Sequence, residues 1–380
     1  MKNYFLINRK YLFGNIFLSL FLLLAVFFGA INTLGLNING FIYLELFFLS
    51  TTMILIFIQG LTNKKDVLLF VSIIIFYIFI SFFLAVNNNF EFNIFDFLVI
   101  YKFLFFFILI SIWFDKEIFS KELLHKFQFK LIFIFLFFYF IQKFLFDIAR
   151  PQVFGENNFE LILLLIIFFF SNVSNKNINI TNIIFMGGVI FLSSSRSAAV
   201  IYLLSIIFML ISKKITIKSL FIVFLIFLSC LGVLFIFSSR LDGDIDSIDR
   251  VNMLNQLLYI VKNWDLGNWL FGVPRITPLP QEVCNALSFY DSLFSYANNG
   301  KCYSVILHAF NMRIIYDHGL IVSFLTFYFV WILMGRKRDL RIKLFVLLAL
   351  IATGFSVSSL NSVFVAISLA ILLSTVSEEK

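Results

Sequence analysis

Runs of apolar residues, each long enough to cross a lipid bilayer, recur along almost the whole of this 380-residue chain. A helix needs about 20 apolar residues to cross the hydrocarbon core of a membrane. Hydrophobic residues make up 61% of the chain and charged residues only 13%, whereas a soluble domain is about 45–50% apolar. One globular core cannot hide so much apolar surface. The sequence therefore predicts an all-α, polytopic membrane protein and excludes a soluble domain.

Hydropathy predicts about twelve membrane spans, several of them short. They lie near residues 11–31, 41–60, 66–86, 93–114, 130–149, 159–173, 180–194, 197–212, 219–238, 314–334, 344–357 and 360–376. Two pairs are the weakest, 180–194 with 197–212 and 344–357 with 360–376. Each of these pairs is also compatible with a broken or re-entrant helix.

Basic residues fall on one side of this arrangement. Lysine and arginine gather in segments 2–10, 64–65, 116–130, 213–218 and 336–343. The intervening loops between the first and second spans and between the third and fourth carry neither. Because basic loops stay in the cytoplasm, both termini are predicted to be cytoplasmic. The net charge of +8 has the same explanation, so no nucleic-acid partner is expected.

This orientation divides the chain into three parts: nine helices in 1–238, a large extracytoplasmic loop in 239–313 and three helices in 314–380. A loop of this length is commonly functional or disordered. Apolar residues recur with helical spacing between 248 and 261, which predicts an amphipathic helix on the membrane surface. We therefore expect a structured lid that contains short amphipathic helices.

Two of the three cysteines, Cys284 and Cys302, lie in this external loop. Because the outward compartment is oxidising, the sequence predicts a disulfide between them, with two unpaired thiols as the alternative. Two cysteines alone do not complete a zinc site, and no metal is expected.

Arg196 interrupts an apolar stretch within the tract Ser193–Ala199. An arginine at such a position usually faces a polar cavity or a partner. Together with Ser195 it would form a fixed cationic site for a phosphate, because a guanidinium matches phosphate oxygens with two parallel hydrogen bonds. An arginine that extends to the outer interface is an equal alternative.

Two of the three histidines lie where the external loop re-enters the membrane, in a tract that holds His308, Asn311, Arg313, Asp317 and His318. Histidine is the side chain best suited to accept a proton near neutral pH, so His308 is a candidate general base. Asp317 and His318 are also candidates for anchoring the next span.

Two further arginines and one glutamate need explanation. Arg250 lies on the predicted surface helix, and Arg275 follows a turn marked by Gly272 and Pro274. Both arginines are compatible with phosphate binding or with pairing to nearby aspartates. Glu160 follows an external turn at the start of a span, where a carboxylate is costly unless it faces a cavity or a partner.

The order of these motifs resembles the O-antigen polymerase (Wzy) and O-antigen ligase superfamily of bacterial membrane glycosyltransferases. The resembling motifs are an external turn in 150–158, the Ser-Arg-Ser turn, an Arg-led helix, a Leu-Phe-Gly turn, and a His and Asn before a Gly-Leu pair. The likeness covers about residues 150–325. Family members often have His and Asn adjacent, whereas Ala309 and Phe310 separate them here, so His318 stays an alternative base.

The resemblance implies a helical bundle of the GT-C type that acts at the outer face of the plasma membrane. The donor is then a glycan carried on undecaprenyl pyrophosphate, no cofactor is needed, and a chain-length regulator is a further candidate partner. Arg196 and Arg250 would bind the pyrophosphate and His308 would activate the acceptor hydroxyl. Arg275, Asn311 and Arg313 are the other candidate substrate-binding residues. A polymerase is favoured, with the ligase and a lipid-linked oligosaccharide flippase as alternatives.

Overall fold

The computed structural model describes residues 2–36, 38, 40–62, 64–88, 93–174, 179–210, 249–335 and 338–376. The regular elements in these ranges are all helices, which confirms the all-α prediction. They are α1 (Lys2–Thr33), α2 (Gly40–Gln59), α3 (Lys65–Asn88), α4 (Ile94–Ile100), α5 (Lys102–Ile112), α6 (Lys121–Phe144), α7 (Asn157–Ser174), α8 (Ile180–Ser193), α9 (Arg196–Leu210), α11 (Asp249–Val261), α12 (Leu266–Phe271), α13 (Gln281–Ala286), η2 (Ser288–Leu293), η3 (Ser304–Leu307), α14 (Phe310–Leu333), α15 (Leu340–Gly354), η4 (Ser359–Asn361) and α16 (Val363–Leu373). The predicted span 219–238 lies outside the described residues.

Five of the described helices, α1, α2, α3, α6 and α14, are long and apolar enough to cross a membrane. The pair α4 and α5, which meet at an angle of 58°, makes a sixth if it forms one bent span. Helices α7, α8, α9 and α16 are apolar but shorter. The fold is therefore that of a helical membrane protein, and the count of about twelve spans stays a prediction.

The helices at the periphery of the bundle expose large apolar side chains, as expected of a surface that faces lipid. Phe57 on α2 is 89% exposed, and Phe79 on α3 is 68% exposed. Soluble monomers rarely expose contiguous apolar patches of such extent. At the centre, every residue of α16 from Val363 to Leu373 is buried, and this helix packs against α7, α5 and α2.

Two predicted helix starts lie too late in the sequence. The fifth predicted span, 130–149, belongs to a helix that begins at Lys121 and ends at Phe144. Its start is capped by Ser120, whose hydroxyl accepts a hydrogen bond from the Leu123 amide. The tenth predicted span, near 314–334, corresponds to α14, which begins slightly earlier, at Phe310. In both cases hydropathy treats polar residues in the first turns of a helix as loop.

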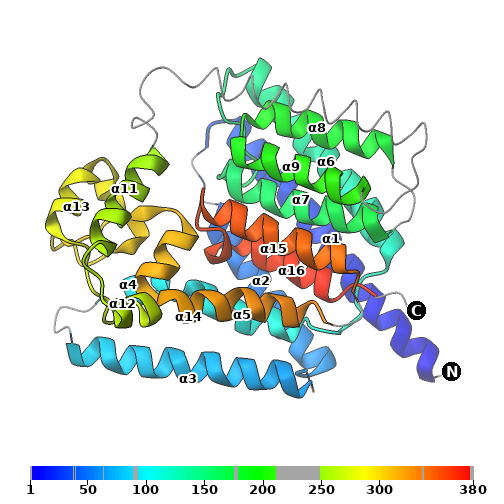
Figure 1. The fold of residues 1–380 in the computed structure, drawn as a ribbon. Coiled ribbons are helices and arrows are strands. Elements are labelled where there is room, and N and C mark those ends of the chain that lie inside the picture. Colours follow the sequence, from blue (N-terminus) through cyan, green and yellow to red (C-terminus); the bar gives the residue numbers. More distant parts are fainter. Residues whose placement is uncertain are drawn as a thin grey trace.

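Residues 249–309 form a separate unit at one end of the bundle, here called the outer subdomain (Figure 1). The N- and C-termini lie at the opposite end (Figure 1). The opposite end is also where Lys64, Lys116 and Arg338 lie, which agrees with the predicted one-sided distribution of basic residues. Lys64 pairs with Asp115, Lys116 donates to the carbonyl of Gly60, and Arg338 donates to that of Thr375.

The outer subdomain has its own apolar core. The predicted helix at 248–261 is confirmed as α11, and its residues Met253, Leu257 and Val261 pack into this core. Leu258 remains 55% exposed, so part of the apolar surface of α11 faces outward. The placement of α11 on a membrane surface stays a prediction.

Two glycines join the outer subdomain to α14. Gly272 and Gly319 have φ angles of +78° and +75°, and their backbones lie against each other. A Cβ on Gly319 would lie 2.4 Å from the Leu270 carbonyl oxygen, and one on Gly272 would lie 2.6 Å from the His318 nitrogen. Beside this contact, the Val273 amide donates to the Tyr316 carbonyl at 2.9 Å. The Leu-Phe-Gly turn and the Gly-Leu pair are thus in direct contact.

Replacing Gly272 by alanine should weaken this docking more than replacing Gly300. Both glycines have positive φ, which costs an alanine roughly 1–3 kcal/mol, but a Cβ on Gly300 would meet nothing within 4 Å. We expect Gly272→Ala to lower the Tm of the purified protein clearly further than Gly300→Ala. Equal Tm values for the two variants would contradict the close backbone contact.

Candidate functional site

Glu160 fixes the external turn at residues 150–158. Its buried carboxylate accepts hydrogen bonds from the Val153 amide at 2.9 Å, from the Phe154 amide at 2.7 Å and from the Tyr139 hydroxyl at 2.6 Å. The expectation that this glutamate needs a partner is confirmed. Its role here is structural, since it holds the turn on the start of α7.

The Ser-Arg turn lies against this first turn. Helix α8 ends at Ser193, and α9 begins at Arg196. The Ser195 hydroxyl donates to Asn158 Oδ1 at 2.8 Å and accepts from the Ala198 amide at 3.4 Å. Arg196 is therefore held, partly exposed, at the start of α9. The partial positive charge of a helix N-terminus adds to the charge of its guanidinium.

Arg250 lies near both the external turn and the end of α15. Its Nε donates to the Ser356 carbonyl at 3.2 Å. Desolvation raises the pKa of Glu156 in the external turn, and the charge of Arg250 opposes this increase. Because a charge lowers a carboxyl pKa in this way only when it is close, Arg250 lies between the turn at 150–158 and the segment that follows α15.

That segment, residues 355–362, is here called the junction turn, and it carries the central contacts of the site. The Ser358 hydroxyl accepts a hydrogen bond from Arg313 at 2.8 Å and donates one to the His308 carbonyl at 2.8 Å. The Val357 carbonyl accepts from the Phe310 amide at 3.2 Å. The junction turn therefore holds the start of α14 and the residue that precedes it.

His308 lies half-buried at the end of η3, in a left-handed conformation with φ of 52°. Its ring makes an edge contact with Tyr290 of the outer subdomain, with ring centroids 4.6 Å apart. Asn311 follows on α14 and donates from Nδ2 to the Ile351 carbonyl at 2.9 Å. A Cβ on Gly354 would lie 2.4 Å from Asn311 Oδ1, so α15 approaches this side chain closely.

Arg313 and Arg275 bind protein acceptors. Arg313 is only 5% exposed, and besides Ser358 it donates to the Val99 carbonyl at 3.3 Å. Arg275 donates to the Asp317 carbonyl at 2.7 Å and lies over the ring of Tyr77, with 5.2 Å to the centroid. Arg313 thus holds α14 to the junction turn and to α4, and Arg275 holds the outer subdomain to α14.

His318 lies on a different face of α14, inside the bundle. It is 1% exposed, and its Nδ1 is 2.8 Å from the Tyr77 hydroxyl. The rings of Tyr101 and Phe103 make edge contacts with it at 4.8 and 5.5 Å. The expectation that residues 317 and 318 anchor this span is confirmed, since the Asp317 carboxylate also accepts a hydrogen bond from Ser304.

Six of the predicted site residues form two groups at the end of the bundle that carries residues 249–309. Ser195 and Arg196 belong to the first group; Arg250, His308, Asn311 and Arg313 surround the end of α15 and the junction turn. The external turn at 150–158 lies beside both groups, since Asn158 accepts a hydrogen bond from Ser195 and the charge of Arg250 acts on Glu156. The sequence analysis missed the junction turn, although its tract Ser356-Val357-Ser358-Ser359-Leu360-Asn361-Ser362 is conspicuously polar within apolar sequence.

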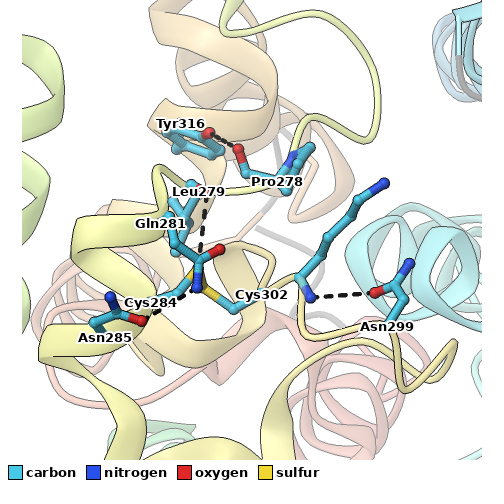
Figure 2. Close-up of a disulfide and its surroundings, with 9 residues drawn as sticks. Pro278, Leu279, Gln281, Cys284, Asn285, Asn299, Cys302 and Tyr316 are labelled. Atoms are coloured by element: carbon cyan, nitrogen blue, oxygen red, sulfur yellow. Dashed lines mark hydrogen bonds between the residues drawn. A yellow bond between two sulfur atoms is a disulfide. The ribbon is translucent and has the colours of Figure 1, made fainter.

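The predicted disulfide between Cys284 and Cys302 is present (Figure 2). Figure 2 also shows the contacts around it: the Leu279 amide donates to the Cys302 carbonyl at 2.8 Å, and the Tyr316 hydroxyl donates to that of Pro278 at 3.1 Å. The disulfide thus fixes the segment that leads to His308 and holds it near α14.

Comparison with protein-family models, with curated proteins and with solved structures finds no match for this chain. The family resemblance therefore remains a prediction.

Removing the disulfide should destabilise the outer subdomain. It closes a loop across a sequence separation of 18 residues, and a loop of that size is worth about 3 kcal/mol in the chain-entropy estimate. We expect the Cys284→Ala/Cys302→Ala double variant to show faster proteolysis within 249–309 while the bundle stays resistant. Maleimide labelling of the native protein without reductant gives the control, because both thiols should be protected.

Proposed function

We propose that this protein polymerises lipid-linked oligosaccharide repeat units, for O-antigen or capsule, at the outer face of the plasma membrane. The bundle would be of the GT-C type with about twelve spans. The donor glycan is carried on undecaprenyl pyrophosphate, and the acceptor is a sugar hydroxyl on the next repeat unit. The observation that carries this proposal is the gathering of Arg250, His308, Asn311 and Arg313 around the end of α15 and the junction turn. Arg196 follows Ser195, which contacts the external turn at Asn158.

The reaction forms one glycosidic bond and breaks one. The acceptor oxygen attacks the anomeric carbon of the donor as its proton passes to a base. The bond from that carbon to the diphosphate breaks, and the carrier leaves with the electron pair. Negative charge therefore grows on the diphosphate in the transition state, and guanidinium groups that face it stabilise that charge.

Exposure supports a division of roles among the arginines. Arg196 and Arg250 are partly exposed, so we assign the diphosphate to them. Arg313 is buried, and Arg275 is held by two backbone carbonyls. We therefore give Arg275 and Arg313 a positioning role, in which they keep the start of α14 and the outer subdomain in place.

Accessibility also supports His308 over His318 as the base. His308 is half-buried next to the junction turn, whereas a shell of aromatic rings encloses His318. A general base must come within about 3 Å of the proton it accepts, directly or through one water. His308 is the more exposed of the two histidines, so we assign the role of base to it.

Arg196→Ala and Arg250→Ala should each abolish long chains while the protein remains folded in the membrane. Loss of one donor that stabilises transition-state charge costs about 10²–10³ in rate. The measurement is the ladder of polysaccharide lengths on a gel, and the matched control is Arg341→Ala, whose partner Asp339 lies at the opposite end. A normal ladder in both Arg196→Ala and Arg250→Ala would contradict the proposal. Unattached chains on the carrier in a deletion strain would indicate the ligase instead.

His308→Gln should reduce polymerisation by about 10²–10⁴, the usual contribution of a general base. His318→Gln keeps a polar group beside Tyr77 and should retain most of the activity per folded molecule. Turnover is compared after normalising to folded protein measured by size-exclusion chromatography. Activity lost in His318→Gln and retained in His308→Gln would reverse the assignment.

A further inference from the structure

A cavity of about 630 Å³ lies at the end of the bundle opposite the candidate site. This volume is in the range of small-molecule and lipid-headgroup pockets. Its walls come from α3, α14, the loop after α5, and the turns that flank α15 and α16. The cavity shares no residue with the junction turn or with the outer subdomain.

A buried cation lies in the wall of this cavity. Lys343 is 7% exposed, and its ammonium lies 4.9 Å from the centroid of the Trp331 ring. Among the described residues, no carboxylate lies within ion-pairing distance of that ammonium. Burying a charge without an anion is costly, so the cavity favours an anionic occupant.

A second cation is close. Arg338 lines the same cavity, where it donates to the Thr375 carbonyl at 3.0 Å. Lys343 lines the same cavity, so the two cations are neighbours; burial, and then the charge of Arg338, lower the pKa of Lys343. Two neighbouring cations, one of them a guanidinium, are suited to the oxygens of a phosphate group.

The carboxylates of the cavity differ from these cations in exposure. Asp66, Asp115 and Glu117 all line it and are all exposed. Asp115 pairs with Lys64 at 3.4 Å. Within the described ranges, Asp66 and Glu117 form no ion pair and can meet a ligand ammonium that points toward water. The polar lining therefore places a phosphate site inside and an ammonium site outside.

The apolar part of the lining completes an amphiphilic site. Phe70, Leu333 and Trp331 line the interior, and Leu69 and Tyr328 at its side are 61% and 44% exposed. In a chain embedded in a membrane, those exposed side chains contact the acyl region. Basic pockets between membrane helices are known to bind lipid headgroups.

We infer that this cavity binds a phospholipid whose headgroup carries a phosphodiester followed by a primary ammonium, that is, phosphatidylethanolamine. The phosphate lies between Lys343 and Arg338, and the ammonium extends to Asp66 and Glu117. The acyl chains leave past Leu69 and Tyr328. This site does not depend on the glycan chemistry at the outer end.

The test uses the full-length protein, stripped of lipid in detergent and then mixed with equal amounts of phosphatidylethanolamine and phosphatidylglycerol. Native mass spectrometry counts the lipids that stay bound. We expect the wild-type protein to retain phosphatidylethanolamine in preference. Lys343→Met should lower that retention about tenfold, the loss expected for one charged hydrogen bond. Lys126→Met, a change at an exposed lysine outside the cavity, is the matched control and should have no effect.

Two further variants keep the test decisive if Lys343→Met folds poorly. Lys343→Arg should restore retention, because it keeps the positive charge. Asp66→Asn, at an exposed position, should remove the preference for phosphatidylethanolamine over phosphatidylglycerol while both lipids still bind. Equal retention of the two lipids by the wild-type protein, or their displacement by inorganic phosphate alone, would overturn the inference.

Discussion

The two hydrogen bonds of the Ser358 hydroxyl are the contacts on which the arrangement of the outer end depends. This hydroxyl accepts from Arg313 and donates to the His308 carbonyl. A polar turn between α15 and the buried helix α16 must find such partners, because unsatisfied polar groups are costly where water is excluded. The start of α14 supplies them. The same requirement that stabilises the fold thus brings His308 and Arg313 to the end of α15.

Features of this structure that depend on local sequence could be predicted. Hydropathy predicted the membrane class, and helical spacing predicted α11. The predicted outward position of Cys284 and Cys302 led to the prediction of their disulfide. Each of these inferences rests on residues that are close in sequence or on one general property of the chain. The motif order also indicated which polar tracts would lie at one end of the bundle.

Other features could not be predicted because they depend on distant partners. The bend at Tyr101 is held in part by Asn361, whose Oδ1 accepts from the Phe103 amide at 2.9 Å across most of the chain. Helix α6 begins earlier than predicted because Ser120 caps its first turn. Hydropathy assigns the lysines of that first part to a loop, although they lie on the helix. The sequence could not show that Arg275 and Arg313 hold α14 in place, because their acceptors are backbone carbonyls of distant residues.

The two ends of the bundle are built differently. At the outer end, a subdomain with its own core is docked through Gly272, Gly319 and Asp96, whose carboxylate accepts from Ser295 at 2.7 Å. At the opposite end, a cavity is lined by the buried Lys343, by the partly exposed Arg338 and by exposed carboxylates. On this account, the proposed glycosyl transfer and the proposed lipid binding take place at opposite ends of the bundle.

The most direct measurement supplies purified protein with a single lipid-linked repeat unit, labelled in its sugar, in reconstituted vesicles. The account predicts products with two or more repeat units on one carrier, formed with release of free undecaprenyl pyrophosphate. Labelled lipid that only moves between the two leaflets, with no new glycosidic bond, would show a flippase and would contradict the central claim.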